Sequence, residues 1–141
     1  MNQYFFEDLT IGKRESLSRE VTSALIEAFS EVSGDHNPLH LDEEYAATTR
    51  FGERIAHGAL MSSFISAALG TVMPGLGTVY LSQTVKFIGP VKIGDLVETE
   101  IEVVARDDKK NKVTLRTVCH VATRKVVDGE ATVYAPSRPK G

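Results

Sequence analysis

Apolar and polar side chains recur at helical spacing in the first 75 residues, whereas the rest of the chain alternates at a period of two. An N-cap at Thr22 or Ser23 predicts a helix that ends at Gly34. Its apolar positions lie mostly three and four residues apart: Ala24, Leu25, Ala28, Phe29 and Val32. Pro38 has no amide hydrogen and disfavours helical backbone at Asn37, so this helix cannot continue past Gly34.

A second strong helix is predicted over residues 57–69, which contain no Asp, Glu, Lys or Arg. Nearly all of its residues are small or apolar, so we expect it to be buried on all sides. Gly70 ends it. A short helix through 43–49, capped by Asp42, and a weakly alternating strand at 15–21 precede it.

The period of two predicts an antiparallel meander in the second half of the chain. The expected strands cover residues 78–88, 97–105 and 113–121, and a last strand resumes at 131–135. A polar turn at 106–111 joins two of them, and Asp128-Gly129 is expected to interrupt the last. One uncharged helix followed by such a meander predicts an α+β fold in which the sheet is wrapped around the helix.

Length and composition are typical of a single globular domain spanning residues 1–141, with residues 136–141 expected to form a flexible tail. The formal net charge of −3 argues against nucleic acid as a partner. The last 41 residues nevertheless hold 9 basic and 5 acidic side chains, either as solvated hairpin charge or as a basic rim for a phosphorylated carrier. Cys119 is the only cysteine, and we find no targeting segment or transmembrane run, so we expect a cytoplasmic protein.

Three of the four histidines, His36, His40 and His57, lie within 22 residues that also hold Asn37, and Asp35 directly precedes them. A metal site is one interpretation, but the i, i+4 spacing of His36 and His40 needs a helix that Asn37-Pro38 interrupts. A purely structural turn is another, shaped by side-chain bonds from Asp35 and Asn37. Nucleophilic hydrolysis is disfavoured, because the sequence has no Gly-x-Ser-x-Gly segment. His120 follows Cys119 directly but faces the other side of the predicted strand, so it is not placed to act as a base for the thiol.

General acid–base catalysis fits the same residues. Asp35 and His40 bracket a rigid turn, so both side chains can project into one cavity and share one water molecule. His57-Gly58 opens the second helix, where free amide groups and the positive end of the helix dipole stabilise a developing oxyanion. Gly58 has no side chain to block a substrate.

The run Phe29-Ser-Glu-Val-Ser-Gly-Asp-His-Asn-Pro-Leu-His40, followed by Ala46, resembles the hydratase 2 motif of MaoC-like hot-dog proteins. More narrowly, the chain resembles the short (R)-specific enoyl-CoA hydratases that supply polyhydroxyalkanoate synthesis. The likeness extends through residues 51–58, the serine-bearing helix, and residues 80–87 and 91–96.

This resemblance implies a hot-dog fold, in which one antiparallel sheet curls around a long helix, and a homodimer whose sheets join edge to edge. It implies a hydro-lyase that adds water reversibly and syn to a trans-2-enoyl-CoA, giving the (R)-3-hydroxyacyl-CoA without a metal or another cofactor. In that reaction Asp35 and His40 are the catalytic residues, which hold the water that attacks C3 and manage the proton delivered to C2.

The resemblance also implies an oxyanion-hole and substrate-binding set. The Gly58 amide polarises the thioester carbonyl, Ser66 lies in the active site, and Asn37 orders the catalytic turn. His57 matches the family pattern, either as a site residue or as a helix cap.

Two other functions use the same residues. A (3R)-hydroxyacyl-ACP dehydratase would run the reaction in reverse on acyl-carrier-protein thioesters, and a non-catalytic hot-dog module would only bind acyl-CoA. A hot-dog thioesterase is less favoured, because those enzymes place their acid elsewhere on the fold. The basic residues considered for the CoA phosphate, with no choice among them, are Lys86, Lys92, Arg116 and Arg124.

Overall fold

The computed structural model describes residues 1–140, in which five strands form one antiparallel sheet. The strands are β1 (Arg14–Glu20), β2 (Val79–Phe87), β3 (Leu96–Asp107), β4 (Lys112–Val121) and β5 (Arg124–Tyr134). Their order across the sheet is β1-β3-β4-β5-β2, so β1 and β2 form its two edges. The predicted meander is therefore confirmed for β3, β4 and β5, whereas β2 pairs with β5 and not with β3, the strand that follows it in the chain.

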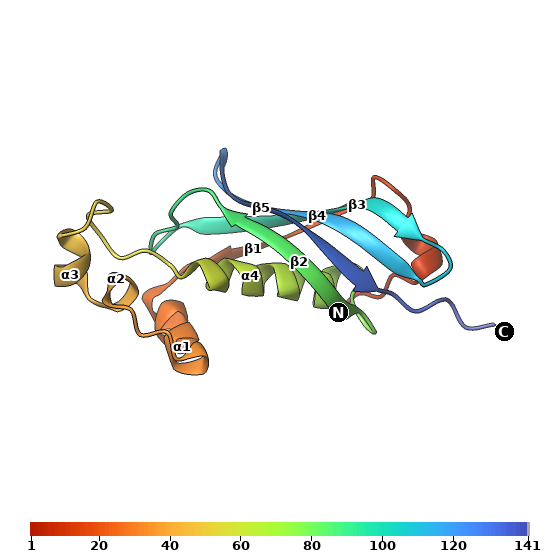
Figure 1. Ribbon diagram of the computed structural model, residues 1–141, viewed down its shortest axis with the longest axis horizontal. Helices are drawn as coiled ribbons and strands as arrows, with labels where there is room; N and C mark the ends of the chain where they lie inside the picture. The colour runs from red at the N-terminus through yellow and green to blue at the C-terminus, as the bar shows by residue number, and fades with distance from the viewer. Residues whose placement is uncertain (141) are drawn as a thin grey trace.

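The α-helices lie on one face and at one end of this sheet, and a short 3-10 turn lies at the opposite end (Figure 1). They are α1 (Ser23–Ser33), α2 (Pro38–Leu41), α3 (Glu43–Ala47) and α4 (Gly58–Ala67), with a 3-10 turn η1 (Phe6–Asp8) and a π-helical turn η2 (Ala68–Val72). As predicted, α1 does not continue through Pro38. Pro38 is instead the first residue of α2, a position for which proline is well suited. None of these helices combines the length and the apolar composition needed to cross a bilayer.

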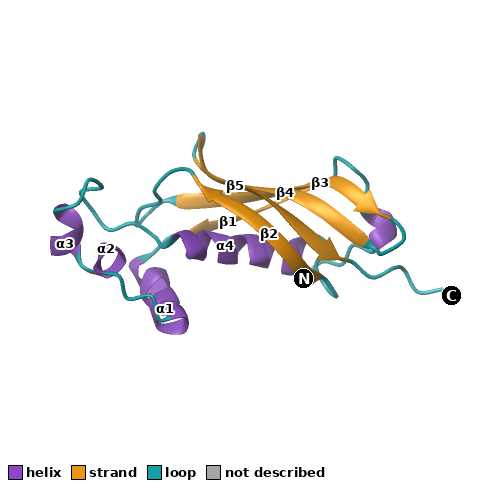
Figure 2. Cartoon of the chain, in the orientation of Figure 1, coloured by secondary structure: helices purple, strands orange, loops and turns teal. Residues whose placement is uncertain are grey.

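The long helix α4 runs along the sheet, and Figure 2 shows the strands lying across it. Its apolar side chains belong to the same buried cluster as the inward-facing residues of β3, β4 and β5. The members from the helix are Leu60, Met61, Phe64 and Ile65. The predicted architecture, a sheet wrapped around one helix, is confirmed.

The expectation that this helix is buried on all sides is wrong for the single chain. Ala59, Ser63 and Ser66 are exposed on the face of α4 that points away from the sheet. These side chains are small or polar, so their exposure to water carries little cost.

The expected interruption at Asp128-Gly129 is also wrong, since β5 continues through both residues. A Cβ atom on Gly129 would lie 2.0 Å from the carbonyl oxygen of Thr84 in β2. The glycine therefore lets the edge strand approach closely rather than ending its own strand.

The end of the described chain, expected to be a flexible tail, contacts the N-terminal segment. The amide of Phe6 donates to the carbonyl of Pro136 at 2.9 Å, and the amide of Arg138 donates to the Glu7 carboxylate at 2.6 Å. Ser137 accepts a hydrogen bond from Asn111 at 2.7 Å. Gly141 lies outside the described residues.

Candidate functional site

The turn after α1 is shaped by its own polar side chains. Gly34 takes a left-handed conformation (φ 79°) that ends the helix. The amide of Asn37 then donates to the carboxylate of Asp35 at 3.2 Å, and the Asn37 side chain accepts from the amide of Leu39 at 3.1 Å, which caps α2. The expectation that Asn37 orders this turn agrees with these bonds.

His40, on α2, is buried and has one ring nitrogen engaged. Its Nδ1 lies 2.8 Å from the carbonyl oxygen of Ile55. Because a carbonyl can only accept, Nδ1 carries the hydrogen in this bond, and Nε2 of the neutral ring keeps a lone pair. This leaves His40 able to accept a proton at Nε2.

His57, the N-cap residue of α4, connects the turn to the helix. It is 2% exposed, and its ring stacks on that of His40 with a centroid distance of 3.9 Å and an interplanar angle of 28°. Its Nε2 lies 3.1 Å from the backbone carbonyl oxygen of Asp35 and 3.1 Å from Oγ of Ser30. One imidazole therefore contacts both residues that the sequence singled out as an acid–base pair.

The surroundings of His57 favour its neutral form. Burial lowers the pKa of His57 below its ordinary value of 6.5, and the hydrogen bond to the carbonyl of Asp35 opposes this shift. The adjacent His40 lowers the pKa further, because two stacked imidazoles resist carrying charge together. Among the described residues, Nδ1 of His57 has no partner to accept the hydrogen that protonation would add.

Side-chain donor atoms of Asp35, His40 and His57 all lie within 4.8 Å of one another. This grouping has the composition of a metal site, but its geometry does not fit one. The in-plane lone pairs of two rings stacked at 3.9 Å do not converge on one ion at the metal–nitrogen distance of about 2.0–2.1 Å. His36, the other histidine of the metal interpretation, is exposed.

Gly58, the first residue of α4, has an amide with no acceptor inside the helix, as is general at this position. It lines a cavity of about 230 Å³ together with mostly apolar residues of the loop before α4, the segment after β2, and β5. A Cβ atom here would lie 3.1 Å from the ring of Phe87, so a larger residue would crowd that wall. Glycine keeps this end of the helix open.

Ser66 does not lie near Gly58 or the other predicted site residues. It lies eight residues further along α4, about 12 Å from Gly58 along the axis, on the exposed face of the helix. In the single chain it is apart from the Asp35, His40 and His57 cluster.

The sequence did not indicate two buried residues behind this cluster. Ser30 is 2% exposed and contacts His57, and Arg54 is 8% exposed. Nε of Arg54 donates to the backbone carbonyl of His40 at 2.7 Å, and another of its nitrogens donates to the hydroxyl of Ser23 at 3.1 Å. A serine in an amphipathic helix and an arginine in a polar loop both look like surface residues, so no local signal marked them.

Residues 9–126 match the family model described as "MaoC like domain". The chain belongs to this family. It is 46% identical to a "3-hydroxybutyryl-CoA dehydratase" of Methylorubrum extorquens, over 95% of this chain and 85% of the relative. It is also 46% identical to an "(R)-specific enoyl-CoA hydratase" of Rhodospirillum rubrum, over 96% of this chain and 94% of that protein.

Among solved structures, the R-hydratase PhaJ1 of Pseudomonas aeruginosa superimposes with a TM-score of 0.91 at 45% identity, covering 95% of this chain and 86% of that one. The chain is therefore similar in sequence to these enzymes and has the same hot-dog architecture as the solved hydratase. The resemblance drawn from the hydratase 2 motif is confirmed.

The neutral state of His57 predicts a pH dependence of stability. Below pH 6.5 the unfolded chain binds a proton on this histidine, whereas the folded protein does not until its lower pKa is reached. The free energy of unfolding should therefore fall as the pH decreases from 6.5 towards that pKa. His57→Gln, which keeps a donor for the Asp35 carbonyl but does not titrate, should weaken this fall in urea unfolding measured between pH 7.5 and 5. Identical pH slopes for both proteins would contradict the assignment.

Proposed function

We propose that this protein is an (R)-specific enoyl-CoA hydratase, which adds water reversibly to the double bond of a trans-2-enoyl-CoA. The observation that carries the proposal is the juxtaposition of the Asp35 carboxylate and the His40 ring next to the start of α4. The names and close similarity of the MaoC-like relatives support a hydro-lyase acting on CoA thioesters.

The chemistry follows from the groups at the site. Asp35 and His40 hold one water molecule, with Nε2 of His40 available to accept a proton. As the water oxygen bonds to C3, an O–H bond breaks and its proton passes to the pair, while the electrons of the double bond move towards the thioester oxygen. The pair then returns a proton to C2. Acid–base groups of this kind contribute about 10²–10⁴-fold to a rate.

The reaction also needs a hydrogen-bond donor that stabilises the thioester oxygen, and Gly58 supplies it. Its amide, at the positive end of α4, donates a hydrogen bond to the thioester oxygen as that oxygen becomes enolate-like. A donor in this role contributes about 10²–10³-fold. An acyl chain that extends from Gly58 along the open face of α4 would pass Ser66, which gives that residue a place in substrate binding.

We also propose that the protein is a homodimer joined along β2. This edge strand pairs with β5 on one side only and exposes apolar side chains that a lone edge rarely shows. They are Val79, Tyr80, Leu81 and Phe87, followed by Ile88. A second copy pairing at this edge would cover them.

Replacement of the acid–base pair tests the activity. Asp35→Asn keeps the shape of the turn, and His40→Asn keeps a donor for the Ile55 carbonyl while removing the nitrogen at the Nε2 position. Each variant should fold and lose hydration of crotonyl-CoA by about 10²–10⁴-fold, measured as loss of the ultraviolet absorbance of the conjugated thioester. His36→Asn, the same change at the exposed neighbour, should leave the rate unchanged. Near-normal turnover in either site variant would sink the proposal.

Sedimentation velocity tests the dimer. The wild type should sediment with twice the mass of the 15.4 kDa chain, and Leu81→Glu should shift it towards monomer by placing a charge at the edge. Ile11→Glu, a charge placed at another exposed apolar residue, serves as the control and should remain dimeric. A monomeric wild type at micromolar concentration would exclude the edge pairing.

A further inference from the structure

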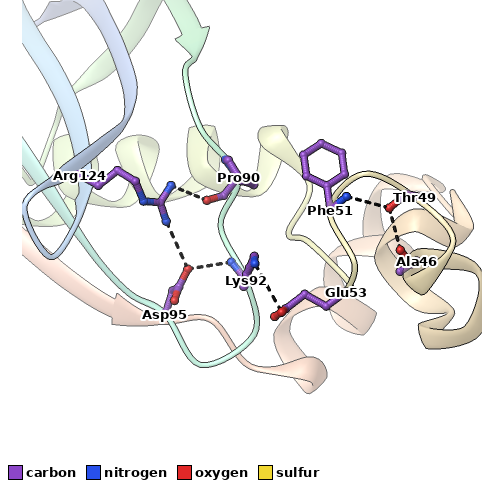
Figure 3. Close-up of polar contacts among 8 residues, drawn as sticks. All are labelled: Ala46, Thr49, Phe51, Glu53, Pro90, Lys92, Asp95 and Arg124. Carbon is purple, nitrogen blue, oxygen red and sulfur yellow. Dashed lines mark hydrogen bonds and ion pairs between the residues drawn. The ribbon is translucent and has the colours of Figure 1, made fainter.

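The cavity beside Gly58 lies between two chain segments that are joined to each other. One wall is the loop before α4, and the other is the segment that follows β2. The amide of Ala56 donates to the carbonyl of Val91 at 2.7 Å, and Lys92 pairs with Glu53 at 3.4 Å (Figure 3). These bonds hold the two walls a fixed distance apart.

The size of this cavity limits what it can enclose. Its volume of about 230 Å³ lies below the range of about 300–1,000 Å³ typical of pockets that bury a drug-sized ligand. An acyl-CoA is larger than such a ligand. If its thioester lies at Gly58, the phosphate-bearing end of the carrier must therefore pass the rim.

The rim carries an unneutralised positive charge at Arg50. Among the described lining residues, Arg50 is the one with a charged side chain, and we find no ion pair or hydrogen bond to its guanidinium within residues 1–140. The group lies 4.8 Å from the ring centroid of the neighbouring Phe51. An exposed arginine without a carboxylate partner remains available to an anion.

The basic residues considered from the sequence differ from Arg50. Lys92 is already paired with Glu53. Arg124 supports the opposite wall, where it donates to the carbonyl of Pro90 at 2.8 Å, and it lies 3.9 Å from Asp95 (Figure 3). It adds positive charge beside the cavity, with one acidic neighbour.

Lys86 and Arg116 are placed differently again. They line a separate hollow over β2, β4 and β5, together with Asp128 and Glu130. Arg116 pairs with Asp128 at 3.5 Å. Gly58 does not line this hollow, so Lys86 and Arg116 are not at the cavity beside Gly58.

We propose that Arg50 binds a phosphate group of the coenzyme A part of the substrate, with Arg124 on the opposite wall adding to the positive potential. This inference rests on the proposed function and assigns the carrier end of the same site. A guanidinium offers paired donors that match phosphate oxygens, and its bonds to phosphate are charge-assisted. The site therefore favours free coenzyme A thioesters over thioesters that lack these phosphates.

Two thioesters with the same reacting group test the assignment. Crotonyl-CoA and crotonyl-pantetheine share the double bond and the thioester, but only the first carries phosphate. Arg50→Gln should raise KM for crotonyl-CoA about tenfold with kcat unchanged, and should leave both constants for crotonyl-pantetheine unchanged. The wild-type KM for crotonyl-CoA should rise with ionic strength towards the value of the variant.

Lys110→Gln is the matched control, since it removes one positive charge from the β3–β4 turn at the other end of the sheet (Figure 1). It should leave KM for both substrates unchanged. Equal effects of Arg50→Gln on both thioesters, or no effect on either, would overturn the proposal.

Direct binding separates this inference from the activity itself. In calorimetry, the wild type should bind coenzyme A about tenfold more tightly than Arg50→Gln does. Equal dissociation constants would exclude Arg50 as the phosphate ligand even if hydration is fast. Conversely, if neither thioester is hydrated, the proposed function fails while the calorimetric comparison still decides the role of Arg50.

Discussion

The burial of α4 against one face of the sheet is the interaction on which the rest of the molecule depends. Leu60, Phe64 and Ile65 place their side chains in the same core as the strands, and each such burial contributes about 1.5–3 kcal/mol. This packing determines where the helix begins. Its N-terminal end lies at the end of the sheet that is nearest to α1, α2 and α3 (Figure 1), and this is where the candidate site forms.

Around that helix start, polar contacts connect segments that are distant in the sequence. Ser30 reaches His57, His57 reaches the carbonyl of Asp35, and Arg54 reaches the carbonyl of His40. Buried polar groups left without partners are costly, so these contacts favour one arrangement of the turn.

Local patterns predicted the elements well because their causes are local. The alternation through β3 and β4 reflects which face of each strand is buried. In α1 the spacing predicted the helix but not its buried face, because Ile26 and Ser30 are buried whereas Val32 is exposed. Gly129 shows the limit of such patterns, since the close approach of β2 that requires it is made by residues about 45 positions away.

The candidate site was predictable in part for the same reason. Asp35 and His40 flank one turn, and His57-Gly58 lies at the start of a helix that the sequence predicts. Ser30, Arg54 and Arg50 were not predictable, because their positions depend on how the turn, the loop and α4 pack together. The spacing of residues along the chain does not predict this packing.

In the proposed reaction, Asp35 and His40 act as one unit on a single water molecule. A double-mutant cycle tests it directly, with kcat/KM for crotonyl-CoA measured for Asp35→Asn, His40→Asn and the double variant. If the pair acts together, the double variant should be no slower than the slower single variant by more than a few-fold, since either change alone removes the shared function. A double variant whose loss equals the product of the two single losses would show independent residues and would contradict the account.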